Sequence, residues 1–134
     1  IFNKDIFINV VQKNIHLNGV TDGPHANNFL TLLEYWINNN IKTNGFDGLL
    51  DINLISIFSS EMLIENGIRI QIDLDLDFII SKSALDSKTL INFKGSEFGE
   101  IFGQFSINDK NIEVNNVMNK LIERLSNKIS EEVN

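Results

Sequence analysis

The segment IRIQIDLDLDFIIS, residues 68–81, alternates apolar and polar side chains almost without interruption. Its even-numbered positions are all apolar, and its odd-numbered positions are all polar except Ile79. A period of two over this length is typical of a β-strand with one buried face and one solvated face. The sequence therefore predicts a sheet that is covered on one side only.

A hairpin is predicted to connect this strand to the apolar segment before it, residues 49–65. The two are joined by Asn66-Gly67, a dipeptide typical of two-residue hairpin turns. Such a turn would pair residues that lie equally far before Asn66 and after Gly67. The inward pairs expected are Leu63–Ile70, Ile57–Leu76 and Ile55–Phe78. Earlier in the segment the apolar positions are even (50, 52 and 54), so we expect a β-bulge between about residues 54 and 60, with Ser59-Ser60 favoured.

The N-terminal third predicts a strand, a turn and a helix. Residues 5–11 are predicted to form the first strand, which could extend to Leu17. Pro24 is expected in the first helical turn with Asp22 or Gly23 as the N-cap, and Asn44-Gly45 is expected to end the helix. The apolar stripe of this helix comprises Phe29, Leu30, Leu33, Trp36, Ile37 and Ile41.

The C-terminal part predicts a further strand and a second helix. After a turn at residues 86–88, residues 89–94 are expected to form a fourth strand with Ile91 and Phe93 inward. The phenylalanines of residues 96–106 follow helical spacing, but two glycines weaken a helix there by about 1 kcal/mol each. We therefore expect a loop or a short helical turn whose phenylalanines cap the core. From about Asn111 the chain is predicted to be helical, with an apolar stripe at Val114, Val117, Met118, Leu121, Ile122, Leu125 and Ile129.

These segments predict one α+β domain over residues 1–134. The order is β-α-β-β-β-α, and the two amphipathic helices need an apolar surface to cover. We expect a two-layer sandwich in which a mainly antiparallel sheet of about four strands carries both helices on one face. The polar side chains of residues 68–81 would then lie on the other face.

The composition excludes several classes of function. A net charge of −7 with only two arginines argues against binding to nucleic acid, since that needs clustered Lys and Arg. The absence of Cys excludes disulfides, thiolate zinc sites and a Cys nucleophile in this chain. No apolar run reaches the roughly 18–20 residues needed to span a bilayer. Because the chain begins at Ile1 and not at Met, we expect that a segment preceded it, for example a signal peptide or a lipoprotein leader.

Three carboxylates form an acidic stripe on the solvated face of the central strand. Asp73, Asp75 and Asp77 are spaced about 6.6 Å apart along it. Carboxylates on one surface could bind a divalent cation or act as an acid–base pair, but side chains at i and i+2 on a flat strand do not converge. A solvated face is therefore the favoured interpretation, a surface for a cationic partner is the second, and neither a metal nor a cofactor is expected.

No catalytic residue is predicted. His16 and His25 are the only histidines, each expected to be isolated at the surface, and the nucleophile-elbow motif G-x-S-x-G is absent. The glycine-containing segments 22–23 and 44–48 lack the spaced ligands of a calcium loop and the Lys and Ser/Thr of a phosphate loop. We therefore expect a protein that is not an enzyme.

Aromatic side chains offer one candidate ligand site. Tyr35 and Trp36 of the first helix, together with Phe98, Phe102 and Phe105, could line an apolar pocket. The alternative is that they belong to an ordinary core.

Four segments carry a resemblance to a known group of proteins. They are the strand and turn of residues 6–24, the helix of residues 26–42, the hairpin through Asn66-Gly67 into residues 68–78, and the closing helix of residues 114–129. In this order of elements the chain resembles the small α/β lipoproteins of the Gram-negative cell envelope. These include the lipopolysaccharide-assembly lipoprotein LptE, the YajG-like lipoproteins and the auxiliary lipoproteins of ABC-type lipid transport systems.

The resemblance implies a function without catalysis. It implies a periplasmic protein that supports an outer-membrane assembly or a lipid-transport complex and has a protein partner in the envelope. Its contact with the outer membrane would be a lipid anchor on a Cys that precedes Ile1 in the precursor. The alternative is a soluble carrier, in the cytoplasm if the resemblance fails, that binds a small apolar ligand between the helices and the sheet.

Overall fold

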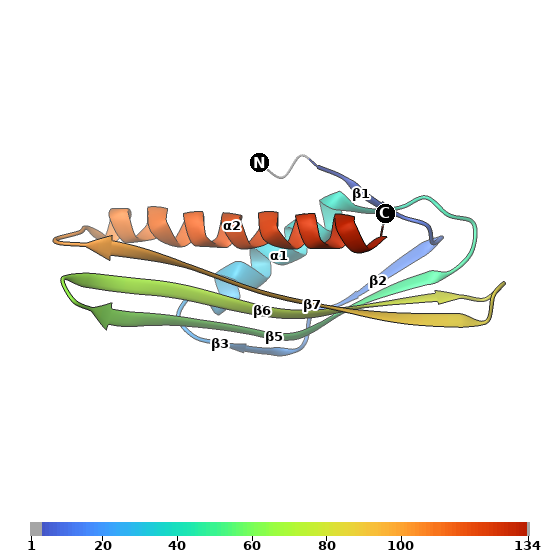
Figure 1. Cartoon of the computed structure of the whole chain (residues 1–134), viewed down its shortest axis with the longest axis horizontal. Coiled ribbons are helices and arrows are strands. Elements are labelled where there is room, and N and C mark those ends of the chain that lie inside the picture. The colour runs from blue at the N-terminus through green and yellow to red at the C-terminus, as the bar shows by residue number, and fades with distance from the viewer. Residues whose placement is uncertain (1–3, 134) are drawn as a thin grey trace.

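The computed structural model describes residues 4–133, which form a sheet with both helices on one face (Figure 1). The confirmed prediction is the fold class: an α+β arrangement with two helices over a mainly antiparallel sheet. The elements in chain order are β1 (Ile6–Ile8), β2 (Gln12–His16), β3 (Val20–Asp22), α1 (Ala26–Asn40), β4 (Ile41–Thr43), β5 (Leu49–Ile64), β6 (Gly67–Lys82), β7 (Ser87–Phe102) and α2 (Ile107–Val133).

Three long antiparallel strands dominate the five-stranded sheet. Its order is β2-β5-β6-β7, and β3 pairs with β5 further along the same edge as β2. Both β2 and β3 run parallel to β5. The prediction of one first strand over residues 5–11 is wrong, because β1 pairs with β4 in a separate two-stranded parallel sheet. Ile6, Ile8 and Val10 are buried in the core, so the chain here follows the core from one sheet to the other.

The predicted β-bulge is present, but at another residue. Leu54 pairs with Leu76 and Ser56 with Asp75, which leaves Ile55 as the extra residue instead of Ser59-Ser60. The hairpin loop is Glu65–Asn66, with Asn66 in the left-handed region at φ 61°, and the strands pair two positions away from the predicted register. The bulge removes Ile55, which was predicted to face inward, from the alternation, and its side chain is 44% exposed. Leu63 stays on the face of its partner Ile68, because a shift of two positions keeps the face, but at the end of β5 it is 87% exposed.

β7 is longer than predicted because residues 96–102 continue the strand and do not form a loop or a helical turn. Gly95 and Gly99 lie on the face beneath α2, and a Cβ on Gly99 would come 2.9 Å from the Val117 side chain. The missing side chains thus allow the helix to lie against the strand. Phe98 and Phe102 consequently lie on the other face, and neither caps the core.

The ends of α1 also differ from the prediction. His25 is the N-cap, in place of Asp22 or Gly23, and the helix ends at Asn40, so that Asn44-Gly45 comes only after β4. Lys13 provides hydrogen bonds to backbone carbonyls at the C-terminal end of α1: its Nζ donates to the carbonyls of Ile37 at 3.1 Å and Ile41 at 2.6 Å. Burial lowers the pKa of Lys13.

The core forms where the two predicted helix stripes meet the inner face of the sheet. The stripe of α2 is buried along its length, and Trp36 and Phe29 of α1 are 1% and 0% exposed. Phe78 and Phe93 meet edge to face with ring centroids 5.1 Å apart. α2 begins at Ile107, earlier than predicted, because Ser106 and Asp109 form a reciprocal capping pair at 3.0 Å each way.

Candidate functional site

Exposed apolar side chains gather at the end of the molecule that holds the β5–β6 and β7–α2 loops, on the left in Figure 1. We call this group the apolar end. It comprises Met62 and Leu63 of β5, Phe98 and Phe102 of β7, Phe105 of the following loop, and Ile107 and Ile112 of α2. Single exposed apolar residues are ordinary, but a group of this size on loops and strand ends is typical of a binding surface.

The strand register explains the charged part of the apolar end. Met62, Arg69 and Glu100 lie on one rung of β5, β6 and β7. The Arg69 guanidinium is 3.0 Å from the Glu100 carboxylate and lies 4.6 Å from the centroid of the Phe98 ring. The positive charge of Arg69 is therefore already engaged by a carboxylate and an aromatic face.

The apolar end is acidic around its apolar residues. Residues 61–69 and 98–113 contain five carboxylate side chains and two basic ones. Both basic groups are paired, Arg69 with Glu100 and Lys110 with Glu61. A partner for this end would therefore be favoured by apolar contacts together with positive charge.

A carboxylate shared by two nitrogen groups fixes α1 and α2 to β5 beside the apolar end. Glu61 Oε1 lies 2.6 Å from His25 Nε2 and 2.7 Å from Lys110 Nζ. The His25 side chain is 12% exposed, so the prediction of an isolated surface histidine is wrong at this position. Burial by itself would raise the pKa of Glu61, but the hydrogen bonds from Lys110 and His25 outweigh it and hold that pKa below its ordinary value.

The acidic stripe lies on the face opposite the helices, as predicted, and its carboxylates are held by neutral donors. Asp73 accepts from the Ser96 hydroxyl and from the Gln71 amide at 3.1 Å. Asn92 Nδ2 bridges Asp75 at 2.7 Å and Asp77 at 2.6 Å. The role of these three residues as a surface for a cationic partner stays a prediction.

The five aromatic residues predicted to line a pocket lie in three different settings. Trp36 is buried in the core, whereas Tyr35 is 64% exposed on the other side of α1. Phe98, Phe102 and Phe105 belong to the apolar end and are 50%, 62% and 38% exposed. The structure therefore brings the three phenylalanines to one end of the molecule and separates Trp36 from them by burial.

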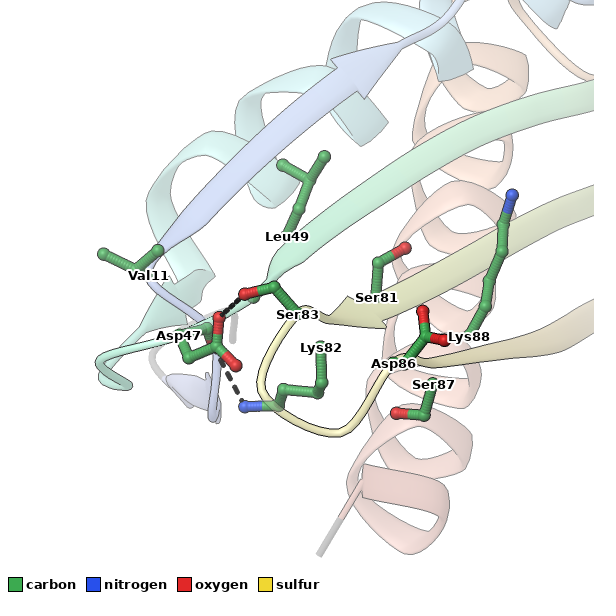
Figure 2. Close-up of a pocket in the computed structure, with 10 residues that line it drawn as sticks. Val11, Asp47, Leu49, Ser81, Lys82, Ser83, Asp86, Ser87 and Lys88 are labelled. Carbon is green, nitrogen blue, oxygen red and sulfur yellow. Dashed lines mark hydrogen bonds between the residues drawn. The ribbon is translucent and has the colours of Figure 1, made fainter.

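A cavity of about 520 Å³ opens at the other end of β6 and β7, and Figure 2 shows its lining. Asp47, from the loop before β5, accepts hydrogen bonds from the Ser83 hydroxyl and from the Ala84 N–H at 2.9 Å, and these bonds lower its pKa. Lys82 Nζ donates to the carbonyls of Asn9 and Asp47. Asp47 and Lys82 thus join the β6–β7 turn to two neighbouring loops, which is a structural role.

Residues 4–133 contain no arrangement of three His, Cys, Asp or Glu side chains that could hold a metal ion. His16, the other histidine, lies 3.3 Å from Asp51 at the surface. Neither helix of the described chain is long and apolar enough to cross a membrane. The described residues therefore supply contact surfaces and no candidate metal site.

Comparisons with known proteins give likenesses of fold only. No protein-family model matches the chain, and neither does any curated protein. Among solved structures, a minor lipoprotein from Acinetobacter baumannii is similar over 92% of both chains at 14% identity and a TM-score of 0.49. A neuraminyllactose-binding hemagglutinin homolog from Helicobacter pylori matches at 10% identity and a TM-score of 0.49 over 98% of this chain and 90% of that one.

Lipoprotein GNA1162 from Neisseria meningitidis is also similar, at 8% identity and a TM-score of 0.41, over 90% of this chain and 99% of that one. The solved structures that this fold matches thus include lipoproteins of Gram-negative bacteria. At TM-scores below 0.5, these likenesses do not say what the chain does.

Sequence reasoning missed two features of the apolar end. Leu63 was expected to face inward and nothing was expected of Met62, although the apolar run Met62-Leu63-Ile64 breaks the alternation and could have signalled exposure on both faces. The contacts of Glu61 left no such signal, because His25 and Lys110 are distant from it in sequence and only the packing of α1 and α2 brings them together.

Proposed function

We propose that this chain is a non-enzymatic module of the bacterial cell envelope that binds a protein partner through its apolar end. In this proposal it supports an outer-membrane assembly or a lipid-transport complex, as the small α/β envelope lipoproteins do. The observation that carries the proposal is the group of seven exposed apolar side chains at one end of the molecule, with Leu63 at 87% and Ile107 at 80% exposure.

The alternative of a small-ligand carrier has less support. A ligand between the helices and the sheet would have to lie among Trp36, Phe29 and Phe78, which are 0–1% exposed and belong to one packed cluster. Opening a cavity there would cost the dispersion and burial energy of that contact. A binding surface at the apolar end needs no such rearrangement.

The test uses the full-length precursor expressed in a Gram-negative host with labelled palmitate, followed by membrane fractionation. We expect label in the outer-membrane fraction. A photo-crosslinking residue at Leu63 should then form a discrete adduct with one protein, while the same residue at Tyr35, which is exposed on α1, should not. An unlabelled protein in the cytosol would overturn the envelope location, and equal crosslinking at both positions would overturn the role of the apolar end.

A further inference from the structure

The last part of β5 is an open sheet edge. β6 pairs with β5 along its whole length, but on the other side β2 covers only residues 49–53 and β3 only residues 56–58. In Figure 1, β3 ends well short of the β5–β6 loop. Within residues 4–133, no strand pairs with residues 59–64 of β5 on that side.

The backbone of this segment presents hydrogen-bonding groups to the open side. The two-residue loop closes on Ile64 and Gly67, so the backbone of Ile64 is bonded to β6 and that of Leu63 points away from it. The contact of Gly23 supports this assignment of outward-pointing backbone groups. A Cβ on Gly23 would collide with the carbonyl oxygen of Ser59, which therefore also points to the open side. Ser59 is occupied by this turn and by His25, whose N–H donates to its hydroxyl at 2.8 Å. The outward groups of Glu61 and Leu63 have no strand beside them.

The two edges of the sheet are treated differently. β7 forms the other edge; α2 covers the adjacent inner face of this strand, and from it Lys128 donates to the Lys94 carbonyl. Such protection by a helix and by lysine is the usual way in which an edge is kept from pairing. The β5 edge carries no Lys or Pro between residues 59 and 64, and its Met62 and Leu63 are 54% and 87% exposed.

We infer that residues 60–64 of β5 receive an extended segment of a protein partner, which continues the line of β3 and extends the sheet by one strand. This inference rests on the proposed function and names the mode by which the apolar end binds. An open edge of about 17 Å accepts a strand of about five residues through main-chain hydrogen bonds. Apolar side chains of that strand would contact Met62 and Leu63.

Charge selects the partner segment. Asp22 and Glu65 flank the open edge as exposed residues, whereas the charge of Glu61 within it is already paired with Lys110. A segment with basic residues at its ends is therefore favoured, whereas a second copy of this edge would bring two sets of these carboxylates together. The occupant is accordingly a basic, apolar strand of another protein.

Fluorescence anisotropy with a labelled peptide KVTVTVK tests the inference on the wild-type chain. We expect saturable binding, weaker binding of EVTVTVE, and none of the strand-breaking peptide KVTPTVK. In Leu63→Pro the outward N–H is lost without loss of a bond to β6, and the affinity should fall by about fivefold to tenfold. Tyr35→Ala, on the exposed face of α1, is the matched control and should leave the affinity unchanged.

Met62→Lys gives an independent variant in case Leu63→Pro does not fold, and its added charge should weaken KVTVTVK binding while circular dichroism stays that of the wild type. Equal binding to the wild type and to both variants would overturn the inference. So would a dimer in sedimentation that is lost in Met62→Lys, which would assign the edge to a second copy, or vesicle binding that depends on Leu63, which would assign it to lipid. The palmitate experiment is separate, so a cytosolic precursor with intact peptide binding would reject the envelope location and keep the edge.

Discussion

The close approach of α2 to β7 at Gly99 makes Gly99→Ala a destabilising substitution, although Ala is the better residue for a strand. An added Cβ would lie 2.9 Å from Val117 Cγ2, closer than real Cβ contacts, and would also meet the Glu113 carboxylate. The Glu113 side chain can swing away, since it is long and partly exposed. Val117 cannot, because it is fully buried and β-branched.

The expected loss follows from two opposing terms. Overpacking of a core position costs about 1–3 kcal/mol, and replacing Gly by Ala returns about 0.5–1 kcal/mol through the entropy of the unfolded chain. Gly99→Ala should therefore lower the free energy of unfolding by about 1 kcal/mol and the Tm by about 3–5 °C. Val117→Ala alone should cost about 2 kcal/mol, the loss of two buried methyl groups with a cavity.

Urea unfolding of the wild type, both single variants and the double variant provides the assay. In the double variant the new methyl group occupies space that Val117 has vacated, so the two losses should fall short of additivity by about 0.5–1 kcal/mol. Gly95→Ala is the matched control, because its Cβ would meet the terminal Leu121 Cδ1 at 3.0 Å and Arg124 Cδ at 3.8 Å and no β-branched side chain, and we expect a change within about 0.5 kcal/mol. Additive losses, or a Gly99→Ala variant more stable than the wild type, would refute the close packing of helix on strand.

Three further predictions concern the contacts of Glu61, the packing of α2 on the sheet and the acidic stripe. Glu61→Gln should cost about 1–2 kcal/mol at neutral pH. Folding lowers the pKa of Glu61, so this contribution is present above its ordinary value of 4.5 and is lost as the pH falls through the folded value. The stabilities of wild type and variant in urea titrations should therefore converge in acid. Leu121→Asp should abolish cooperative unfolding by circular dichroism, since it buries an unpaired charge at a position that is 0% exposed, whereas an intact transition would contradict the packing. Calcium added to the wild type should give no calorimetric heat, and a heat that Asp75→Asn removes would show a cation site on the stripe.

The strands and helices could be predicted from the sequence wherever a regular spacing of apolar residues continued over a long segment. β6 was read from its alternation alone, and the stripe of α2 from Val114 to Ile129, because periods of 2 and 3.6 record directly which face is buried. The failures lie where two local signals compete. The phenylalanines near Gly99 follow helical spacing, yet the strand continues because the glycines serve the approach of α2 and do not mark a break.

The candidate site was predictable only in part. Phe98, Phe102 and Phe105 were singled out together, and they do lie at one end of the molecule, but as exposed residues instead of a pocket lining. The exposure of Phe98 and Phe102 depends on which face of β7 these two residues occupy. The face is set by the register in which β7 pairs with β6, and a short segment of sequence does not determine that register.

The sequence by itself determined the sheet with one polar face, the two helices that must cover the other face, and the acidic stripe, because each of these is a local periodicity of side chains. Only the tertiary structure decided that β1 leaves the main sheet, that Glu61 meets His25 and Lys110, and that the end of β5 stays open. These features depend on strands and helices that are distant in sequence. Their relative positions follow from the summed packing of the core, and no single segment carries that information.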